Sequence, residues 1–84
     1  MTSYEAVSGV YKTMAATRER VTTLHHAGFR GFKAEVRSGV YRTPKRRFEA
    51  EHNFHTRNGA RAELHALQRA GFHGFVQRVT QSSS

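Results

Sequence analysis

Hydrophobic residues recur at helical spacing in two stretches of the chain. The first stretch carries a stripe made of Met14, Thr17, Val21, Leu24 and Gly28. This spacing predicts a helix with Thr13 as its N-cap and Gly28 as its C-terminal stop. The second stretch starts near Thr56, ends at Gly71 and carries a similar inward-facing set, Ala60, Leu64 and Leu67.

Four other stretches have the composition or the alternation of strands. Residues 4–11 are rich in β-branched and aromatic side chains, and residues 29–37 alternate between apolar and charged ones. Residues 46–52 alternate less regularly, and the set expected to face the core is Phe48, Ala50 and His52. Residues 72–79 form the fourth predicted strand.

The predicted order is therefore strand, helix, strand, strand, helix, strand. Two split β-α-β units in this order predict an α+β, ferredoxin-like fold with a four-stranded antiparallel sheet. Both helices are expected on one face of the sheet. The other face is expected to be open and to meet a ligand.

The chain also contains an internal repeat. The pattern L-x-x-A-G-F-x-G-F begins at Leu24 and again at Leu67, an offset of 43 residues. Repeats of this length are copies of one supersecondary unit. We predict a single domain over residues 1–80, built from repeats at about 4–36 and 47–79, followed by a disordered tail at 81–84.

The charge favours a polyanionic partner. Lys and Arg number 14 against six acidic residues, all Glu, and the net charge is +8. Such a charge accelerates encounter with polyanions, although it also serves solubility. With no cysteine, the chain has neither disulfides nor thiolate metal ligands. Residues 1–8 do not have the pattern of a signal peptide, and no apolar run approaches a membrane span. We therefore expect a cytoplasmic location and no membrane partner.

The strongest basic cluster lies in and beside the central connection, residues 38–45. Arginines and aromatic residues on a hairpin beside a sheet are suited to phosphate contacts and base stacking. The alternative is a solvated hairpin whose charges prevent pairing between sheet edges. The predicted ligand-binding residues are Tyr4, Arg37, Tyr41, Arg42, Lys45, Arg46 and Arg47.

Metal binding and catalysis have little support in the sequence. His25 and His26 are adjacent on a predicted helix and point in different directions, so they are a poor chelate. His52 and His55 lack an interleaved carboxylate or cysteine. No serine lies in a nucleophile-elbow context. We predict no metal site, no cofactor and no enzymatic activity.

Several of these motifs resemble a known family. The sequence is similar to a SPOR domain, the sporulation-related repeat that binds glycan strands of peptidoglycan. Gly9-Val10-Tyr11 after Tyr4 resembles the opening of the family's repeat, and Leu24 through Gly28-Phe29 and Leu67 through Gly71-Phe72 resemble its close. The resemblance implies the same α+β fold and a glycan ligand. Val7 occupies a position where the family commonly has a glutamine.

Three functions follow as hypotheses. The first is a non-catalytic module that binds nucleic acid through the open sheet face and the basic hairpin. The second is recognition of peptidoglycan glycan, as the family resemblance implies. The third is a protein-interaction module, such as a small effector acting on a host protein. The sequence does not distinguish a monomer from a homodimer.

Overall fold

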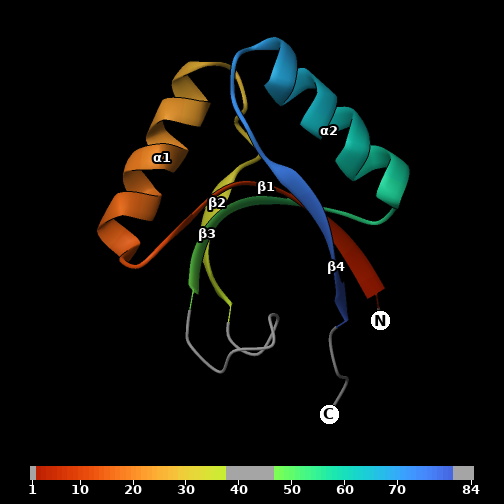
Figure 1. Ribbon diagram of the computed structural model, residues 1–84, viewed down its shortest axis with the longest axis horizontal. Helices are drawn as coiled ribbons and strands as arrows, with labels where there is room; N and C mark the ends of the chain where they lie inside the picture. Colours follow the sequence, from red (N-terminus) through yellow and green to blue (C-terminus); the bar gives the residue numbers. More distant parts are fainter. Residues whose placement is uncertain (1, 38–46, 81–84) are drawn as a thin grey trace.

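The structure, a computed structural model, describes residues 2–37 and 47–80 of the chain (Figure 1). The elements are β1 (Thr2–Tyr11), α1 (Met14–His26), β2 (Lys33–Arg37), β3 (Arg47–Phe54), α2 (Arg57–Arg69) and β4 (Phe75–Thr80). This is the predicted order. The predictions for the central connection and for the tail at 81–84 lie outside the described residues.

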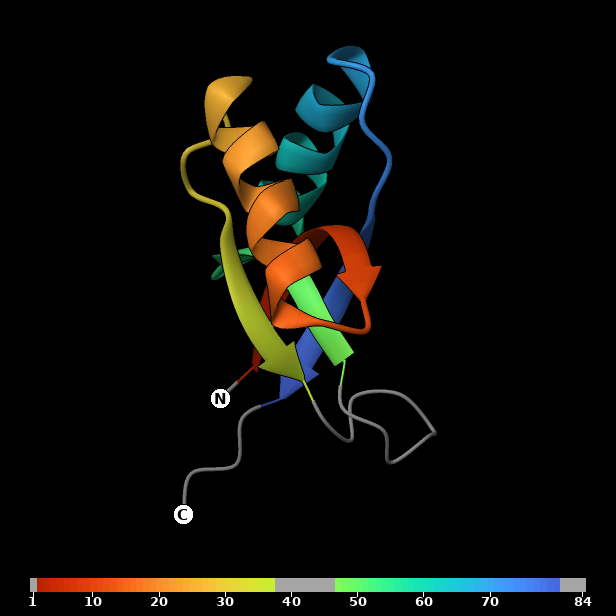
Figure 2. The same ribbon diagram turned by 90° about the vertical axis from the view of Figure 1, so that its left-hand side faces the viewer.

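The four strands form one sheet in the order β2-β3-β1-β4, and every neighbouring pair is antiparallel. Both helices lie on the same face of this curved sheet, as the two views in Figures 1 and 2 show. The α+β, ferredoxin-like arrangement is therefore confirmed. Near the end of β1 the pairing with β3 shifts between Val7 and Val10, where Gly9 has a φ of 139°.

Both helices begin and end with the same local chemistry. The hydroxyl oxygens of Thr13 and Thr56 accept hydrogen bonds from the third residue along, at 3.2 and 3.1 Å, which caps two otherwise unsatisfied N–H groups. Gly28 and Gly71 follow the helices with φ values of 100° and 91°. Residues with a Cβ atom adopt this positive-φ conformation at a steric cost, whereas glycine adopts it without one.

The two halves of the domain correspond closely. Helix α2 begins and ends 43 residues after α1, and the same offset relates the two capping threonines. Phe29 and Phe72, which are equivalent in the two halves, meet edge to face with their ring centroids 6.0 Å apart. Aromatic pairs favour this geometry, so this contact helps to hold the two halves together.

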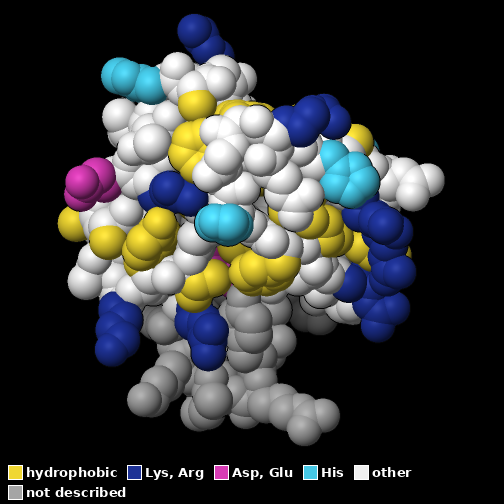
Figure 3. Space-filling view, turned by 45° about the horizontal axis from the view of Figure 1, so that its top comes forward, with side chains coloured by type: hydrophobic (Ala, Val, Ile, Leu, Met, Phe, Trp, Pro, Cys, Tyr) yellow, Lys and Arg dark blue, Asp and Glu magenta, His cyan; other side chains and the backbone are white. Residues whose placement is uncertain are grey.

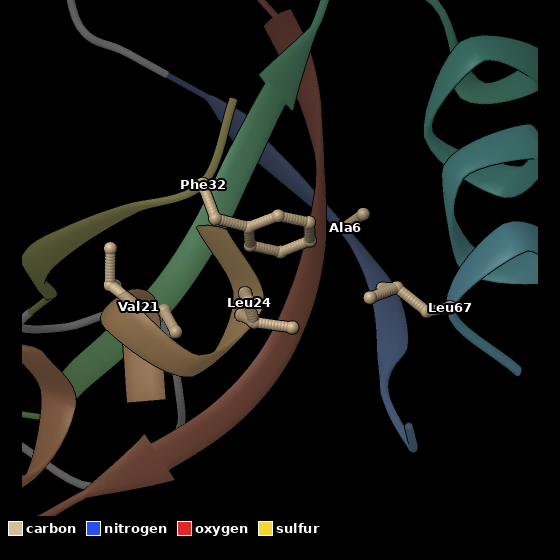
Figure 4. Packing of buried hydrophobic residues seen from close by; sticks show 6 residues of the cluster. Ala6, Val21, Leu24, Phe32 and Leu67 are labelled. Carbon is tan, nitrogen blue, oxygen red and sulfur yellow. The ribbon is translucent and has the colours of Figure 1, made fainter. Parts of the chain in front are cut away.

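The hydrophobic core lies between the sheet and the helices (Figure 4). Its side chains come from both helices and from three segments of the sheet layer, and its buried members are Ala6, Val21, Leu24, Phe32, Ala50 and Leu67. Leu24 and Leu67 occupy equivalent positions in the two helices, and both are fully buried. Burying a leucine side chain contributes roughly 1.5–3 kcal/mol, so these two residues anchor the helices to the sheet.

Two predicted strands begin later than expected, and β1 and β3 extend further than expected. Strand β2 begins at Lys33 rather than residue 29, and β4 at Phe75 rather than residue 72. The preceding phenylalanines close the helices instead. The amide nitrogens of Phe29 and Phe72 donate to the carbonyl oxygens of Leu24 and Leu67, each at 2.9 Å. These bonds commit the two segments to helix termination rather than to the sheet.

Candidate functional site

The helix-free face of the sheet is not open at its centre. Glu5 and Val7 of β1 and Glu49 and Glu51 of β3 are fully buried there. The register explains why they share a face, because Val7 pairs with Glu51 while Glu5 lies two residues away on the same side of β1. The expectation of an exposed face therefore fails at these four residues. As predicted, Ala50 of β3 faces the helices and lies in the core.

The three glutamates form the one group of possible metal ligands found within residues 2–37 and 47–80. One carboxylate oxygen from each lies within 4.8 Å of the others, which suits a hard cation such as Ca²⁺ or Mg²⁺. The side-chain amide of Gln77 also enters the cluster. Its Nε2 donates to Oε1 of Glu5 at 2.8 Å and to Oε1 of Glu49 at 2.9 Å. Two of the carboxylates are thereby joined through one half-buried amide.

The histidines considered from the sequence take no part in that group. His52 instead contacts a glutamate of α2, with its Nδ1 2.6 Å from Oε2 of Glu63. Its ring also packs against Phe54, with the centroids 4.2 Å apart. Nε2 of His25 lies 2.7 Å from the carbonyl oxygen of Phe32. These contacts tie β3 to α2 and α1 to the segment before β2.

The predicted ligand-binding residues are only partly described. Arg37 and Arg47 are direct backbone partners in the β2–β3 register, at the end of β2 and the start of β3. The other four residues of the predicted hairpin cluster, Tyr41, Arg42, Lys45 and Arg46, lie outside the described residues. Tyr4 lies at a different place, on the helix side of the sheet.

Tyr4 lines a surface pocket with a volume of about 300 Å³. Three arginines also line it, and the remaining walls are apolar: the complete lining is Tyr4, Arg57, Arg61, Leu64, Val76 and Arg78. We call this site the arginine pocket. Figure 3 shows basic side chains over much of this face, with the largest group on the right of the view, the side on which α2 begins.

Three elements position the arginines. Arg57 and Arg61 are one turn apart on α2, and such residues lie on the same helix face. Arg78 belongs to β4 and pairs directly with Tyr4 of β1. The Cζ atom of Arg57 lies 5.4 Å from the centroid of the Tyr4 ring, a cation–π geometry. The ring thus holds one guanidinium at the pocket.

The positive charges of Arg57 and Arg61 are not stabilised by the other residues of the first turn of α2. A helix N-terminus is stabilised by acidic residues, yet the first turn of α2 contains none and begins with Arg57. Two arginines four residues apart also repel each other, which costs a helix about 0.2–0.5 kcal/mol. Within the described residues no ion pair joins Arg57, Arg61 or Arg78 to a carboxylate. An anionic ligand would relieve this repulsion.

The internal repeat provides a comparison within the same chain. At the offset of 43 residues, Met14 stands where the second half has Arg57, and Glu35 stands where it has Arg78. The Nζ of Lys33 lies 3.2 Å from Oε1 of Glu35, so this acid is paired locally. The first half builds the same secondary structure with an arginine, Arg18, at only one of the three equivalent positions. The arginine pocket is therefore not a requirement of the fold.

Sequence reasoning missed Arg57, Arg61 and Arg78. One signal was present, since two arginines occupy i and i+4 at the start of a helix that lacks acidic residues in its first turn. The contribution of Arg78 was not visible, because it depends on the pairing of β4 with β1 across 74 residues of chain. Only Tyr4 was predicted and lies in the pocket.

Comparisons with protein families, with curated proteins and with solved structures find no match for this chain. In the described part of the chain, no helix combines the length and the apolar character that crossing a membrane requires.

Proposed function

We propose that this protein is a non-catalytic, cytoplasmic module that binds nucleic acid, and that the arginine pocket contacts its phosphates. The observation that carries the proposal is the convergence of Arg57, Arg61 and Arg78 on one pocket. The net charge of +8 supports the same class of partner.

The chemistry of the pocket is suited to phosphate. A guanidinium is always charged at neutral pH and presents its N–H groups in a planar fork that matches two phosphate oxygens. Leu64 and Val76 form apolar walls beside these charges. All three arginines are exposed, so a phosphate can reach each guanidinium from solvent.

The basic hairpin remains part of the proposal as a second contact. Its predicted residues would neutralise further phosphates along a strand, while Tyr41 would stack on a base. Arg37 and Arg47 lie at the base of this hairpin by their register.

The test measures affinity for fluorescent single- and double-stranded DNA and RNA by anisotropy. The pocket variant is the double substitution Arg61→Ala and Arg78→Ala. The control variant is Arg18→Ala with Arg30→Ala, which removes the same charge from exposed positions in the first half. Arg18 is the repeat counterpart of Arg61, so the two variants are closely matched.

We expect the pocket variant to bind at least about tenfold more weakly than the control variant, because hydrogen bonds to charged groups contribute about 1.5–3 kcal/mol each. Equal loss in both variants would mean that only total charge matters. Binding to purified sacculi that survives moderate salt would favour the glycan ligand of SPOR domains instead. A stoichiometric protein partner captured after nuclease treatment would favour a protein-interaction module.

A further inference from the structure

We infer that the arginine pocket binds a terminal phosphate monoester of a nucleic acid strand rather than a phosphodiester within it. The inference rests on the proposed function and specifies the group that the pocket takes. It follows from the shape of the site, from the number of charges around it and from the role of Tyr4.

The shape of the site favours an end over a continuous strand. Proteins that track a strand present a basic groove along several nucleotides. Here the three arginines instead line one pocket of about 300 Å³, at the small end of the range for ligand sites. A compact anion can contact all three arginines at this one place, whereas a continuous strand would need further basic sites along its path.

The charges favour the same group. A phosphate monoester carries a charge of about −1.5 to −2 at pH 7 and offers three terminal oxygens. A phosphodiester carries one charge and offers two such oxygens. Arg57 and Arg61 line the pocket from α2 and Arg78 lines it from β4, so different arginines can bind different oxygens of one phosphate.

Tyr4 has a supporting role in this arrangement. The sequence predicted Tyr4 as a ligand-binding residue, and in the structure the guanidinium of Arg57 lies over its ring at 5.4 Å. Tyr4 is half-buried, and its pairing with Arg78 places it between the arginines of the two elements. Restricting an arginine before binding reduces the entropy lost when the anion arrives. Tyr4 is therefore a positioning residue.

The test compares three labelled oligonucleotides of identical sequence, with a 5′-phosphate, with a 3′-phosphate or with hydroxyl groups at both ends. Each is titrated with the wild-type protein, the pocket variant and the control variant. We expect a terminal phosphate to tighten wild-type binding by about tenfold or more, as one or more charge-assisted hydrogen bonds would. The pocket variant should lose this increment and the control variant should keep it. The oligonucleotide that shows the increment identifies the end that is bound.

Three outcomes would overturn the inference. If the wild type bound all three oligonucleotides equally, the pocket would not recognise a terminal phosphate. The proposed function, nucleic acid binding, would be unaffected. If the pocket variant kept the gain in affinity from a terminal phosphate, the phosphate would bind at another site on the protein. Stronger competition by a phosphoserine peptide than by the phosphorylated oligonucleotide would assign the pocket to a phosphoprotein. Failure to bind any oligonucleotide would instead remove the proposed function itself.

Discussion

The guanidinium of Arg57 lies over the ring of Tyr4, with its Cζ 5.4 Å from the ring centroid. The two residues come from different elements, the first turn of α2 and the start of β1. Their contact joins the start of the helix to the sheet where Arg78 pairs with Tyr4. The contact restricts the side chain of Arg57 before a ligand binds to the arginine pocket.

This contact predicts a dependence on the ring of Tyr4 rather than on its hydroxyl group. Tyr4→Phe keeps the aromatic face and should bind oligonucleotides like the wild type. Tyr4→Leu keeps an apolar side chain but removes the face, and should weaken binding by a few-fold, since an exposed cation–π contact contributes about 0.5–1 kcal/mol. Anisotropy titrations measure both, and equal affinity of the two variants would contradict this role of the ring.

A second prediction concerns stability at the helix-free face. Gln77→Leu removes the amide that donates to Glu5 and Glu49, so two buried carboxylate oxygens lose a donor. We expect the free energy of unfolding to fall by about 1–3 kcal/mol, measured by urea denaturation. Gln68→Leu is the control because Gln68 is exposed on α2, and it should stay within about 0.5 kcal/mol of the wild type. Equal stability of the two variants would contradict a structural role for the amide.

A third prediction tests the packing around His52. A Cβ atom built on Gly31 would overlap the imidazole ring of His52, which Glu63 and Phe54 hold in place. Gly31→Ala should therefore lower the free energy of unfolding by about 1–3 kcal/mol through overpacking. In a His52→Ala background the same substitution should cost much less, giving a coupling energy of at least about 0.5 kcal/mol. Additive effects in this double-mutant cycle would show that the two residues do not compete for space.

Much of the fold could be predicted because its determinants are local. The helix starts at Thr13 and Thr56 and the stops at Gly28 and Gly71 depend on capping chemistry that is visible in a few residues. The strand starts were wrong at residues 29 and 72. Those segments alternate as strands do, but their first residues donate hydrogen bonds to the end of the preceding helix. Periodicity alone cannot distinguish a strand from such a helix end.

The candidate site could not be predicted as a whole, because tertiary structure assembles it. Tyr4 and Arg78 meet only through the register of β1 with β4, which no local pattern specifies. The burial of Glu49 and Glu51 was missed for a related reason. Charged residues on the alternate face of a strand are usually exposed, and the pattern does not show what surrounds them.

The most direct test of the arginine pocket is the salt dependence of oligonucleotide binding. Each phosphate neutralised on a single strand contributes about −0.7 to the slope of log affinity against log salt. The pocket variant, Arg61→Ala with Arg78→Ala, should show a slope shallower than that of the wild type by about 0.7 for each phosphate that the pocket neutralises. The control variant, Arg18→Ala with Arg30→Ala, should keep the wild-type slope. Identical slopes in the wild type and the pocket variant would show that the arginine pocket does not contact phosphate.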